Sequence, residues 1–518
     1  MRRATAGVLA GAVAAVAACA STAAAADRIY WADRAGGMIP PVGFANLDGS
    51  GGGNPLTTGA SPGFAEGMTI DAGAGRLYWA NGGADKISFA NLDGSGGGGD
   101  LLDLKGPQGL AVDPSARRIY WANYADNKIS FAGLDGGAGG DLNTGAATVA
   151  SPISVALDPA GGRIYWANNT SPKISYANLD GSGGGDVDTT GATVAAAWGL
   201  AVDTAAGRIY WGNSSAPQGI YFANLNGSGG GQLVTTGATV QDPAGVAVDV
   251  PAGRVYWANG NGTISSAGVT GADGRNLDTS GAVLNGPNQV ALLRAPVAAG
   301  VPSLSGGFSH GSVLSCSPGV WAPDLPASHL YRVPQTSATQ WNRNGTAIPG
   351  ATGSAIVADV PGVYTCTVTG SNVAGSASQT SGGHVVDPGF GDRTLVTLRL
   401  ARRRIGPRER LPIRVANRND FPVRVQLSGR GSAEVRASRR RVVRLRTARF
   451  DLGSGRARTV RLRVPRLLRR ELVRTGRLRL RISAAVTDPS RNSRTVRKRI
   501  VPRLKRPGGA RARLAPRS

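Results

Sequence analysis

Residues 163–183 read RIYWANNTSPKISYANLDGSG, and similar stretches recur along the first half of the 518-residue chain. Each copy carries a Tyr-Trp pair inside a short apolar run, at spacings of 42 to 48 residues. The pairs are Tyr30 and Trp31, Tyr78 and Trp79, Tyr120 and Trp121, Tyr165 and Trp166, Tyr210 and Trp211, and Tyr256 and Trp257. A period of this length is typical of β-propellers, in which each repeat forms one four-stranded blade.

Every copy has the same internal order of short segments. In one copy an apolar first segment, GLAVD at 199–203, precedes the Tyr-Trp segment, and IYFANL, a turn NGSGGG and a last segment QLVTTG follow it. The Tyr-Trp segment at 28–31 has no first segment before it, whereas NQVALL at 288–293 has that pattern after the sixth copy. We therefore predict an all-β chain in which residues 27–295 form a six-bladed β-propeller, closed by both ends of the repeat region.

The motif RIYWAN followed by KISYANLDGSG resembles the YWTD repeat, which is the class B repeat of low-density-lipoprotein-receptor proteins, here in a protein of bacterial type. The resemblance covers about half of the chain. It implies a six-bladed propeller in which the Tyr-Trp pairs fill the space between adjacent blades. The Thr of the motif is Ala or Gly in all six copies, and its Asp is Asn in five of them. Receptor function does not follow from a shared fold.

The first 26 residues have the features of a signal peptide, with two arginines, an Ala/Val/Leu/Gly run and a final Ala-Ala-Ala. We expect the protein to be secreted or associated with the cell surface. An alternative lies in the same stretch, because VAAC at 16–19 resembles a bacterial lipobox, in which Cys19 is lipidated. No other stretch reaches the roughly 18 apolar residues of a transmembrane segment, so we expect none in the mature chain.

Residues 296–388 have a different pattern. Cys316 and Cys366 lie 50 residues apart with Trp341 between them, and Tyr364 stands two residues before the second cysteine. These residues resemble the bacterial immunoglobulin-like modules, and the resemblance implies a β-sandwich. Because an exported protein meets oxidising conditions, we expect a disulfide between Cys316 and Cys366 rather than a pair of free thiols.

Residues 389–502 alternate apolar and polar residues, which predicts a basic β-sandwich with arginines on an outer face. Residues 389–518 carry 40 Arg and Lys against 7 Asp and Glu, so the formal net charge of +26 arises in this segment. Two interpretations remain open: the face binds an anionic cell-wall polymer, or it is only solvated. Aromatic residues are scarce there, so we expect no sequence-specific nucleic-acid binding. The tail, 503–518, is expected to be disordered.

Candidate catalytic and metal-binding residues are few. His310, His329 and His384 all lie outside the repeat region, which has neither His nor Cys. This argues against His-based catalysis and His-ligated metals in the propeller, and we expect structural roles for the three histidines. We also expect the aspartates that end the first segments to accept backbone hydrogen bonds in the following turns, rather than to form a carboxylate ring. They are Asp71, Asp113, Asp158, Asp203 and Asp249.

These observations predict a binding or adhesion protein of the cell envelope or extracellular space that is not an enzyme and has no cofactor or metal. Its propeller is expected to bind an unknown protein or glycan. The alternatives are a purely structural surface protein and a carbohydrate-active lyase or hydrolase that uses carboxylates. Loop acids that do not repeat, namely Glu66, Asp85 and Asp126, are the candidate carboxylates for such an enzyme.

Overall fold

The computed structural model describes residues 26–34, 41–95, 97–390, 394–436 and 439–505. Most of the leader, with Cys19, and most of the tail lie outside these ranges. The chain divides into two compact units. The first holds residues up to Gly300 together with Val320–Ala338 and Thr369–Ser378, and the second holds the other residues from Val301 onward. Two stretches of the range expected to be immunoglobulin-like therefore pack with the repeat region.

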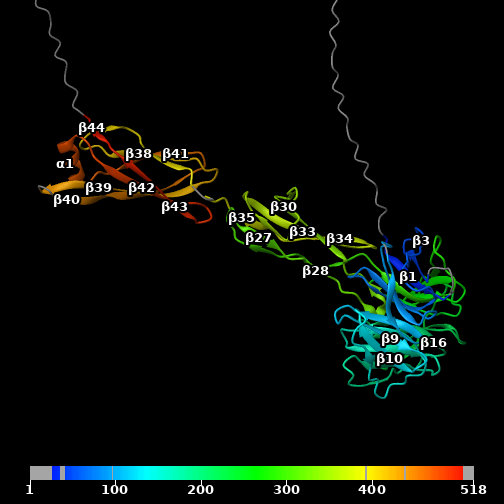
Figure 1. Cartoon of the computed structure of the whole chain (residues 1–518). Helices are drawn as coiled ribbons and strands as arrows, with labels where there is room; N and C mark the ends of the chain where they lie inside the picture. Colours follow the sequence, from blue (N-terminus) through cyan, green and yellow to red (C-terminus); the bar gives the residue numbers. More distant parts are fainter. Residues whose placement is uncertain (1–25, 35–40, 96, 391–393, 437–438, 506–518) are drawn as a thin grey trace, which may run out of the picture. The chain divides into compact units, whose positions relative to one another are not determined.

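The repeat region forms a propeller-like set of six sheets, each with one Tyr-Trp strand (Figure 1). Within each sheet the strands are given in spatial order. The first two sheets are β24 (Pro287–Leu293), β1 (Arg28–Asp33), β2 (Val42–Asn46), β3 (Gly52–Gly53), and β4 (Ala65–Asp71), β5 (Arg76–Asn81), β6 (Lys86–Asn91), β7 (Gly99–Asp103). The third and fourth are β8 (Pro107–Asp113), β9 (Arg118–Asn123), β10 (Lys128–Gly133), β11 (Gly140–Asp141), and β12 (Pro152–Asp158), β13 (Arg163–Asn168), β14 (Ile174–Asn178), β15 (Gly184–Asp186). The fifth and sixth are β16 (Ala197–Asp203), β17 (Arg208–Asn213), β18 (Gly219–Asn224), β19 (Gly230–Gln232), and β20 (Val246–Asp249), β21 (Arg254–Asn259), β22 (Thr263–Gly268), β23 (Arg275–Asn276).

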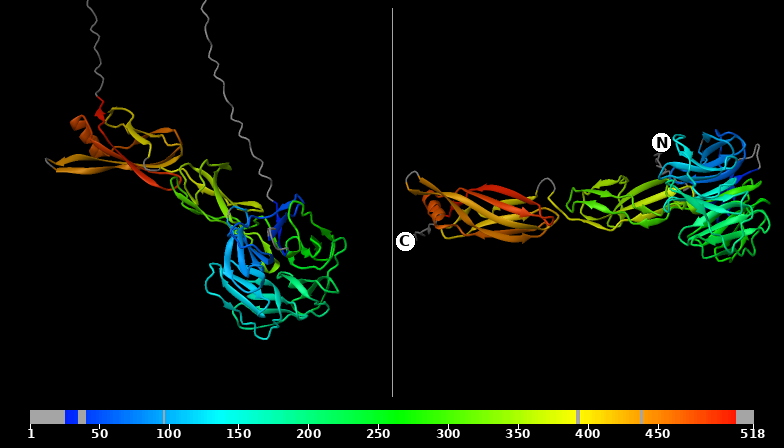
Figure 2. Two further views of the ribbon diagram at one scale, coloured as in Figure 1. Left: turned by 45° about the vertical axis from the view of Figure 1, so that its right-hand side comes forward. Right: turned by 90° about the horizontal axis from the view of Figure 1, so that it is seen from below.

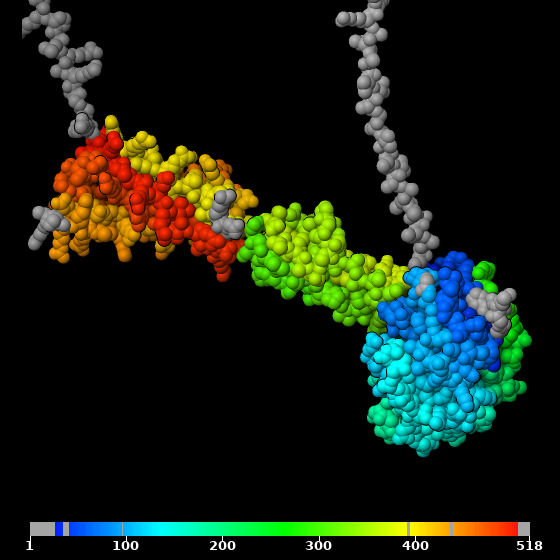
Figure 3. Space-filling model, in the orientation of Figure 1, coloured from blue at the N-terminus to red at the C-terminus, as the bar shows by residue number. Residues whose placement is uncertain are grey.

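The two ends of the repeat region share a sheet. Strand β24 pairs antiparallel with β1, with Arg28 opposite Leu293 and Trp31 opposite Val290. Each first strand also contacts the first strand of the next sheet, from β4 through β8, β12, β16 and β20 to β24, and β24 contacts β4. Figures 2 and 3 show the blue start and the green end of the region side by side.

The Tyr-Trp pairs lie between neighbouring sheets. Each of six apolar clusters contains the Tyr of one sheet and the Trp of the next, for example Tyr165 with Trp211. The cluster of Trp31 and Tyr256 joins the first Tyr-Trp strand to the last one. All twelve side chains are at most 5% exposed. The pairs therefore form the core between sheets.

The fourth strands differ from expectation. The segment QLVTTG was expected to form one of them, but β19 is Gly230–Gln232 and so begins inside the glycine run. Close approach of the strands explains this shift: a Cβ on Gly230 would lie 2.4 Å from the carbonyl oxygen of Phe222 and 3.0 Å from Ala192. Part of the glycine repeat is therefore a strand that only glycine allows to pack so closely.

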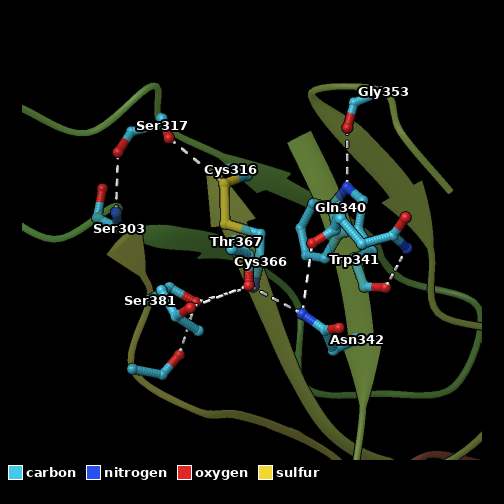
Figure 4. Close-up of a disulfide and its surroundings, with 12 residues drawn as sticks. Ser303, Cys316, Ser317, Gln340, Trp341, Asn342, Gly353, Cys366, Thr367 and Ser381 are labelled. Carbon is cyan, nitrogen blue, oxygen red and sulfur yellow. Dashed lines mark hydrogen bonds between the residues drawn. A yellow bond between two sulfur atoms is a disulfide. The ribbon is translucent and has the colours of Figure 1, made fainter. Parts of the chain in front are cut away.

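The second unit contains the cysteine pair. The sheets around this pair are β26 (Leu304–Gly306), β27 (Val313–Cys316) and β32 (Ala355–Val357), and β31 (Thr346–Ala347), β30 (Thr336–Arg343), β33 (Gly362–Asn372), β34 (Gly375–Thr380) and β35 (His384–Val386). Parts of β30, β33 and β34 belong to the first unit. A disulfide joins Cys316 and Cys366, whose Cα atoms are 6.4 Å apart (Figure 4). Trp341 is fully buried in the same cluster and donates Nε1–H to the carbonyl oxygen of Gly353. The hydroxyl of Tyr364 donates to the carbonyl oxygen of Val360.

The Arg-rich segment forms two sheets around one apolar core. The sheets are β36 (Val396–Leu400), β38 (Leu411–Asn417), β41 (Ala457–Leu462), and β40 (Arg439–Leu452), β39 (Val423–Arg436), β42 (Leu480–Thr487), β43 (Ser493–Ile500). Two features were not expected. Helix α1 (Arg466–Thr475) packs Leu468 and Leu472 into the core and ends at Gly476, whose φ of 69° only glycine adopts easily. At the start of the tail, β44 (Arg503–Leu504) pairs with β37 (Arg404–Ile405), so disorder does not begin at residue 503.

Candidate functional site

One position in each first strand varies while its neighbours repeat. The residue two places before the repeated apolar run is Glu66, Gln108, Ile153, Trp198, Ala244 or Asn288. The next residue is Gly in four of the six strands, where adjacent first strands nearly touch. A Cβ on Gly67 would lie 2.6 Å from the Cα of Gly109, and a Cβ on Gly199 would lie 2.4 Å from the Cα of Gly245. The variable residues therefore stand where the first strands converge.

A β-bulge accompanies this position. The register between first and second strands shifts between Ala65 and Met68, between Pro107 and Leu110, and between Ala197 and Leu200. In β24 the shift lies between Pro287 and Val290. A bulge inserts an extra residue and turns its side chain away from the regular alternation of the strand. In each of these four strands the variable residue therefore lies within the bulge.

Four of these side chains meet, together with Arg34 at the end of β1. The Nδ2 of Asn288 donates to a carboxylate oxygen of Glu66 at 3.1 Å, and Trp198 donates its Nε1–H to Oδ1 of Asn288. Arg34 forms an ion pair with Glu66 at 3.0 Å, and its guanidinium lies 4.9 Å from the centre of the Trp198 ring. Gln108 also hydrogen bonds Glu66. We call Arg34, Glu66, Gln108, Trp198 and Asn288 the axial polar cluster.

The cluster combines buried and accessible groups. Glu66 is 6% exposed and Asn288 is 2% exposed, whereas the Arg34 side chain is 45% exposed and Trp198 is half-buried. Burial raises the pKa of Glu66, and this effect exceeds the opposing influence of Arg34 and Gln108. The carboxyl of Glu66 therefore binds a proton more readily than that of a surface glutamate.

A segment from beyond the repeats lies against the first strands. Residues 326–331, with the short 3-10 helix Pro326–Ser328 and strand β29 (Leu330–Tyr331), pack against the first strands, and β29 pairs in parallel with β24. The Nε2 of His329 lies 3.0 Å from the carbonyl oxygen of Leu200 and 3.2 Å from Nε2 of Gln289. Leu200 lies two residues after Trp198, and Gln289 directly follows Asn288. His329 is fully buried, and burial lowers its pKa from 6.5 to about 4.

The opposite ends of the first strands carry the repeated aspartates. Each Oδ1 accepts a backbone N–H of the following turn at 2.9 to 3.1 Å, which confirms the structural role predicted for Asp71, Asp113, Asp158, Asp203 and Asp249. A cavity of about 370 Å³ lies between these turns and residues 323–327. Asp324 borders it, and burial raises the pKa of this carboxyl. Within the described ranges, no three His, Cys, Asp or Glu side chains group in a way that could hold a metal ion.

Of the three candidate acids, only Glu66 belongs to the cluster. Asp85 is exposed and accepts the backbone N–H of Gly106 at 2.9 Å, and Asp126 is an exposed loop residue. Arg34, Gln108, Trp198 and Asn288 were not predicted as site residues. The signal that could have found three of them was already in the sequence, because each breaks the pattern of its repeat at one shared position.

No protein-family model matches the sequence, and no curated protein is significantly similar to it. Solved structures of similar fold do exist. A structure of a nidogen–laminin complex is 17% identical, covers 51% of this chain and 98% of that chain, and has a TM-score of 0.42. A gluconolactonase from Xanthomonas campestris is 17% identical, covers 51% and 85%, and has a TM-score of 0.36. A virginiamycin B lyase from Staphylococcus aureus is 13% identical, covers 46% and 76%, and has a TM-score of 0.29.

These similarities correct one expectation. The chain was predicted not to be an enzyme, but a lactonase and a lyase are among the proteins whose fold it shares, so that conclusion was wrong. The similarities concern the propeller-like fold and transfer no reaction to this chain. Among the described residues, no helix is long and apolar enough to cross a membrane.

Proposed function

We propose that this chain is an exported protein of the cell envelope or extracellular space that binds a glycan at the axial polar cluster. One observation carries the proposal: the first strands lose their repeat at one bulged position, and four of the side chains there bond to one another or to Arg34. A ring of identical repeats needs no such difference for its packing, whereas a ligand site does.

The chemistry of the cluster suits a sugar. The half-buried indole of Trp198 offers an apolar surface beside polar groups, and aromatic rings of this kind pack against the apolar faces of ligands. Arg34 can donate, Glu66 can accept, and the side-chain amides of Gln108 and Asn288 can do both. A small set of convergent polar groups around an aromatic ring orients a ligand rich in hydroxyls.

The architecture proposed with this function is a closed six-bladed propeller of YWTD type, followed by an immunoglobulin-like domain and a basic sandwich. Three contacts support closure: the pairing of β1 with β24, the shared cluster of Trp31 and Tyr256, and the ion pairs of Arg294 with Asp27 and Asp249. The disulfide and the buried Trp341 support the second domain. The leader pattern supports export.

A glycan array probed with the full chain tests the proposed binding. We expect saturable binding to one glycan group, and at least roughly tenfold weaker binding for Trp198→Ala, since loss of a central aromatic anchor costs more than 1 kcal/mol. Tyr124→Ala, which removes an exposed aromatic ring outside the cluster, serves as the matched control. Equal binding by both variants, or no saturable glycan at all, would contradict the proposal.

A second candidate is an enzyme that acts on carbohydrate at the same cluster, and the raised pKa of Glu66 favours it. The described side chains that hydrogen bond Glu66 are Arg34, Gln108 and Asn288. Hydrolases of glycosidic bonds use two carboxylates about 5–9 Å apart, whereas an elimination needs one base and a cation to stabilise the developing anion. Glu66 and Arg34 supply these two groups.

The two candidates predict different results for Glu66→Gln. If the protein is a lyase, incubation with uronate-containing polysaccharides forms unsaturated products that absorb ultraviolet light. The Glu66→Gln variant should then bind the polysaccharide but release no product. Asp126→Asn, which changes an exposed acid in the same way, should keep full activity. Unsaturated product released equally by Glu66→Gln would rule out Glu66 as the base.

A further inference from the structure

Four arginines stand in one row across the sheet β40-β39-β42-β43. The strand registers place Arg444 opposite Arg430, Arg430 opposite Arg481, and Arg481 opposite Arg499. All four side chains are exposed. Residues directly opposite one another in antiparallel strands project from the same face of the sheet, with Cβ atoms about 4.5–5.5 Å apart. We call these four residues the arginine ladder.

The ladder has no counter-charge among the described residues. The ion pairs of this segment join Arg424 to Asp451, Arg440 to Glu471, and Arg474 to Glu434 and Glu471. None of them includes a ladder arginine. Like charges directly opposite in a sheet are destabilising, so a row of four would be expected to be selected against unless an anion balances it. The acidic side chains in these ion pairs thus neutralise arginines outside the ladder.

The sheet beneath the ladder is firmly packed. In β39 the residues on either side of Arg430 are Gly429 and Gly431, both buried. A Cβ on Gly429 would lie 2.6 Å from Leu445 and 2.7 Å from Ile482, so the core fills the space on that face. The arginines therefore project from a rigid surface, which lowers the entropic cost of arranging them around a ligand.

The surface is also hollowed at the ladder. A depression of about 640 Å³ is lined by Arg430, Arg481 and Arg499, by Arg479, and by the hydroxyl-bearing Ser432. Arg444 borders a second depression of about 680 Å³, which is lined by four further arginines, Arg446, Arg463, Arg466 and Arg469. A long ligand could therefore contact arginines along the whole row.

We propose that the arginine ladder binds a flexible polymer of phosphodiesters, such as a poly(glycerol phosphate). Neighbouring guanidiniums one strand apart can donate to one phosphate from two sides, because the oxygens of a tetrahedral phosphate point in more directions than the two coplanar oxygens of a carboxylate. Ser432 adds a hydroxyl donor for a phosphate oxygen. No aromatic residue lines either depression, so the surface offers no platform on which bases could stack. This inference is independent of the proposed function of the axial polar cluster.

Binding of the full chain to synthetic poly(glycerol phosphate), measured at 50 and 200 mM salt, tests the proposal. The variant Arg430→Thr/Arg481→Thr should bind roughly tenfold more weakly, and its dependence of log affinity on log salt should be shallower by about 1 to 2. The matched control is Arg399→Thr/Arg414→Thr. It removes another exposed pair of directly opposed arginines, from β36 and β38, and hence the same charge. The control should bind like the unaltered protein.

Two other polyanions, one with carboxylates and one with phosphodiesters on a stiff duplex, test the choice of polymer. Polygalacturonate and duplex DNA of equal charge should each bind more weakly than poly(glycerol phosphate). Equal weakening by the two double variants would show a general charge effect and overturn the ladder, and tighter binding of either other polymer would overturn the choice of ligand. Thermal unfolding checks that the variants fold: without polymer, Arg430→Thr/Arg481→Thr and the control should have the Tm of the unaltered protein. The polymer should then raise the Tm of Arg430→Thr/Arg481→Thr less than it raises that of the unaltered protein.

Discussion

Trp198 differs from the repeated tryptophans in the surroundings of its indole. Trp166, Trp211 and Trp257 are fully buried and donate Nε1–H to backbone carbonyl oxygens of threonines. Trp198 is half-buried, donates to Asn288, and lies beneath the Arg34 guanidinium. One residue type is therefore buried between sheets at six repeated positions, whereas at this position it belongs to the axial polar cluster.

His329 makes a prediction about pH at the residue scale. Its pKa is lowered to about 4 in the folded protein, while the unfolded chain binds the proton near pH 6.5. Between these values the unfolded state holds more protons, so the free energy of unfolding should fall by about 3 kcal/mol as pH drops from 6.5 to 4. His329→Gln cannot titrate, and thermal unfolding between pH 4 and 7 should show a weaker dependence on pH. An unchanged dependence would mean that His329 is not neutral in the folded state.

At the scale of elements, the short fourth strands depend on glycine. Strand β19 lies so close to β18 that a Cβ on Gly230 would overlap the carbonyl oxygen of Phe222, whereas a Cβ on Gly231 would meet only the Phe222 ring at 3.7 Å. The two adjacent residues thus have opposite tolerances for a side chain. Glycine in a strand marks such close approaches, and here the approach recurs, as at Gly52 and Gly184.

The variants Gly230→Ala and Gly231→Ala test this difference between the two positions. Gly230→Ala should lower the free energy of unfolding by roughly 1–3 kcal/mol, because β19 must move away from its neighbour. Gly231→Ala should be neutral or slightly stabilising, since alanine restricts the unfolded chain. Chemical denaturation of the two variants compares them directly. Equal stabilities would show that the fourth strand is not held at this distance.

The elements also show what the sequence could predict. The Tyr-Trp repeat was enough to locate all six first strands and all six second strands, because apolar residues at a fixed spacing indicate burial. Helix α1 was missed because its arginines mask the helical spacing of Leu468 and Leu472 within a segment that otherwise alternates. The shared variable position could have marked Gln108, Trp198 and Asn288 as site residues. Arg34 carries no such signal, and the bulges that accompany the variable position leave no periodic pattern in the sequence from which the contacts could be assembled.

At the scale of the whole molecule, Arg294 joins the two ends of the repeat region. It forms ion pairs with Asp27, which precedes β1, and with Asp249, whose side chain is 1% exposed. Residue 293 is Leu where the other first strands end in Asp, and Leu293 lies opposite Tyr331 of β29. The last first strand thus lacks the turn aspartate of the others. It is followed instead by an arginine that contacts the start of the region at Asp27 and the turn aspartate of the preceding first strand, Asp249.

Arg294→Ala should therefore weaken the whole repeat region. Removing one partner leaves the carboxylate of Asp249 buried without its cation, which we expect to cost about 2 kcal/mol, less than for a fully buried pair. The Tm should fall by roughly 4–8 °C. Arg275→Ala, which removes an exposed arginine from β23, should leave the Tm unchanged. Similar values for both variants would argue against closure through Arg294.

The most direct test of the ligand site is a crystal structure of the full chain soaked with the glycan that binds best on the array. We predict electron density for a sugar ring against Trp198, with hydrogen bonds to Arg34 and Glu66. Density for the glycan at any other surface, with the axial polar cluster unchanged, would contradict the proposed site.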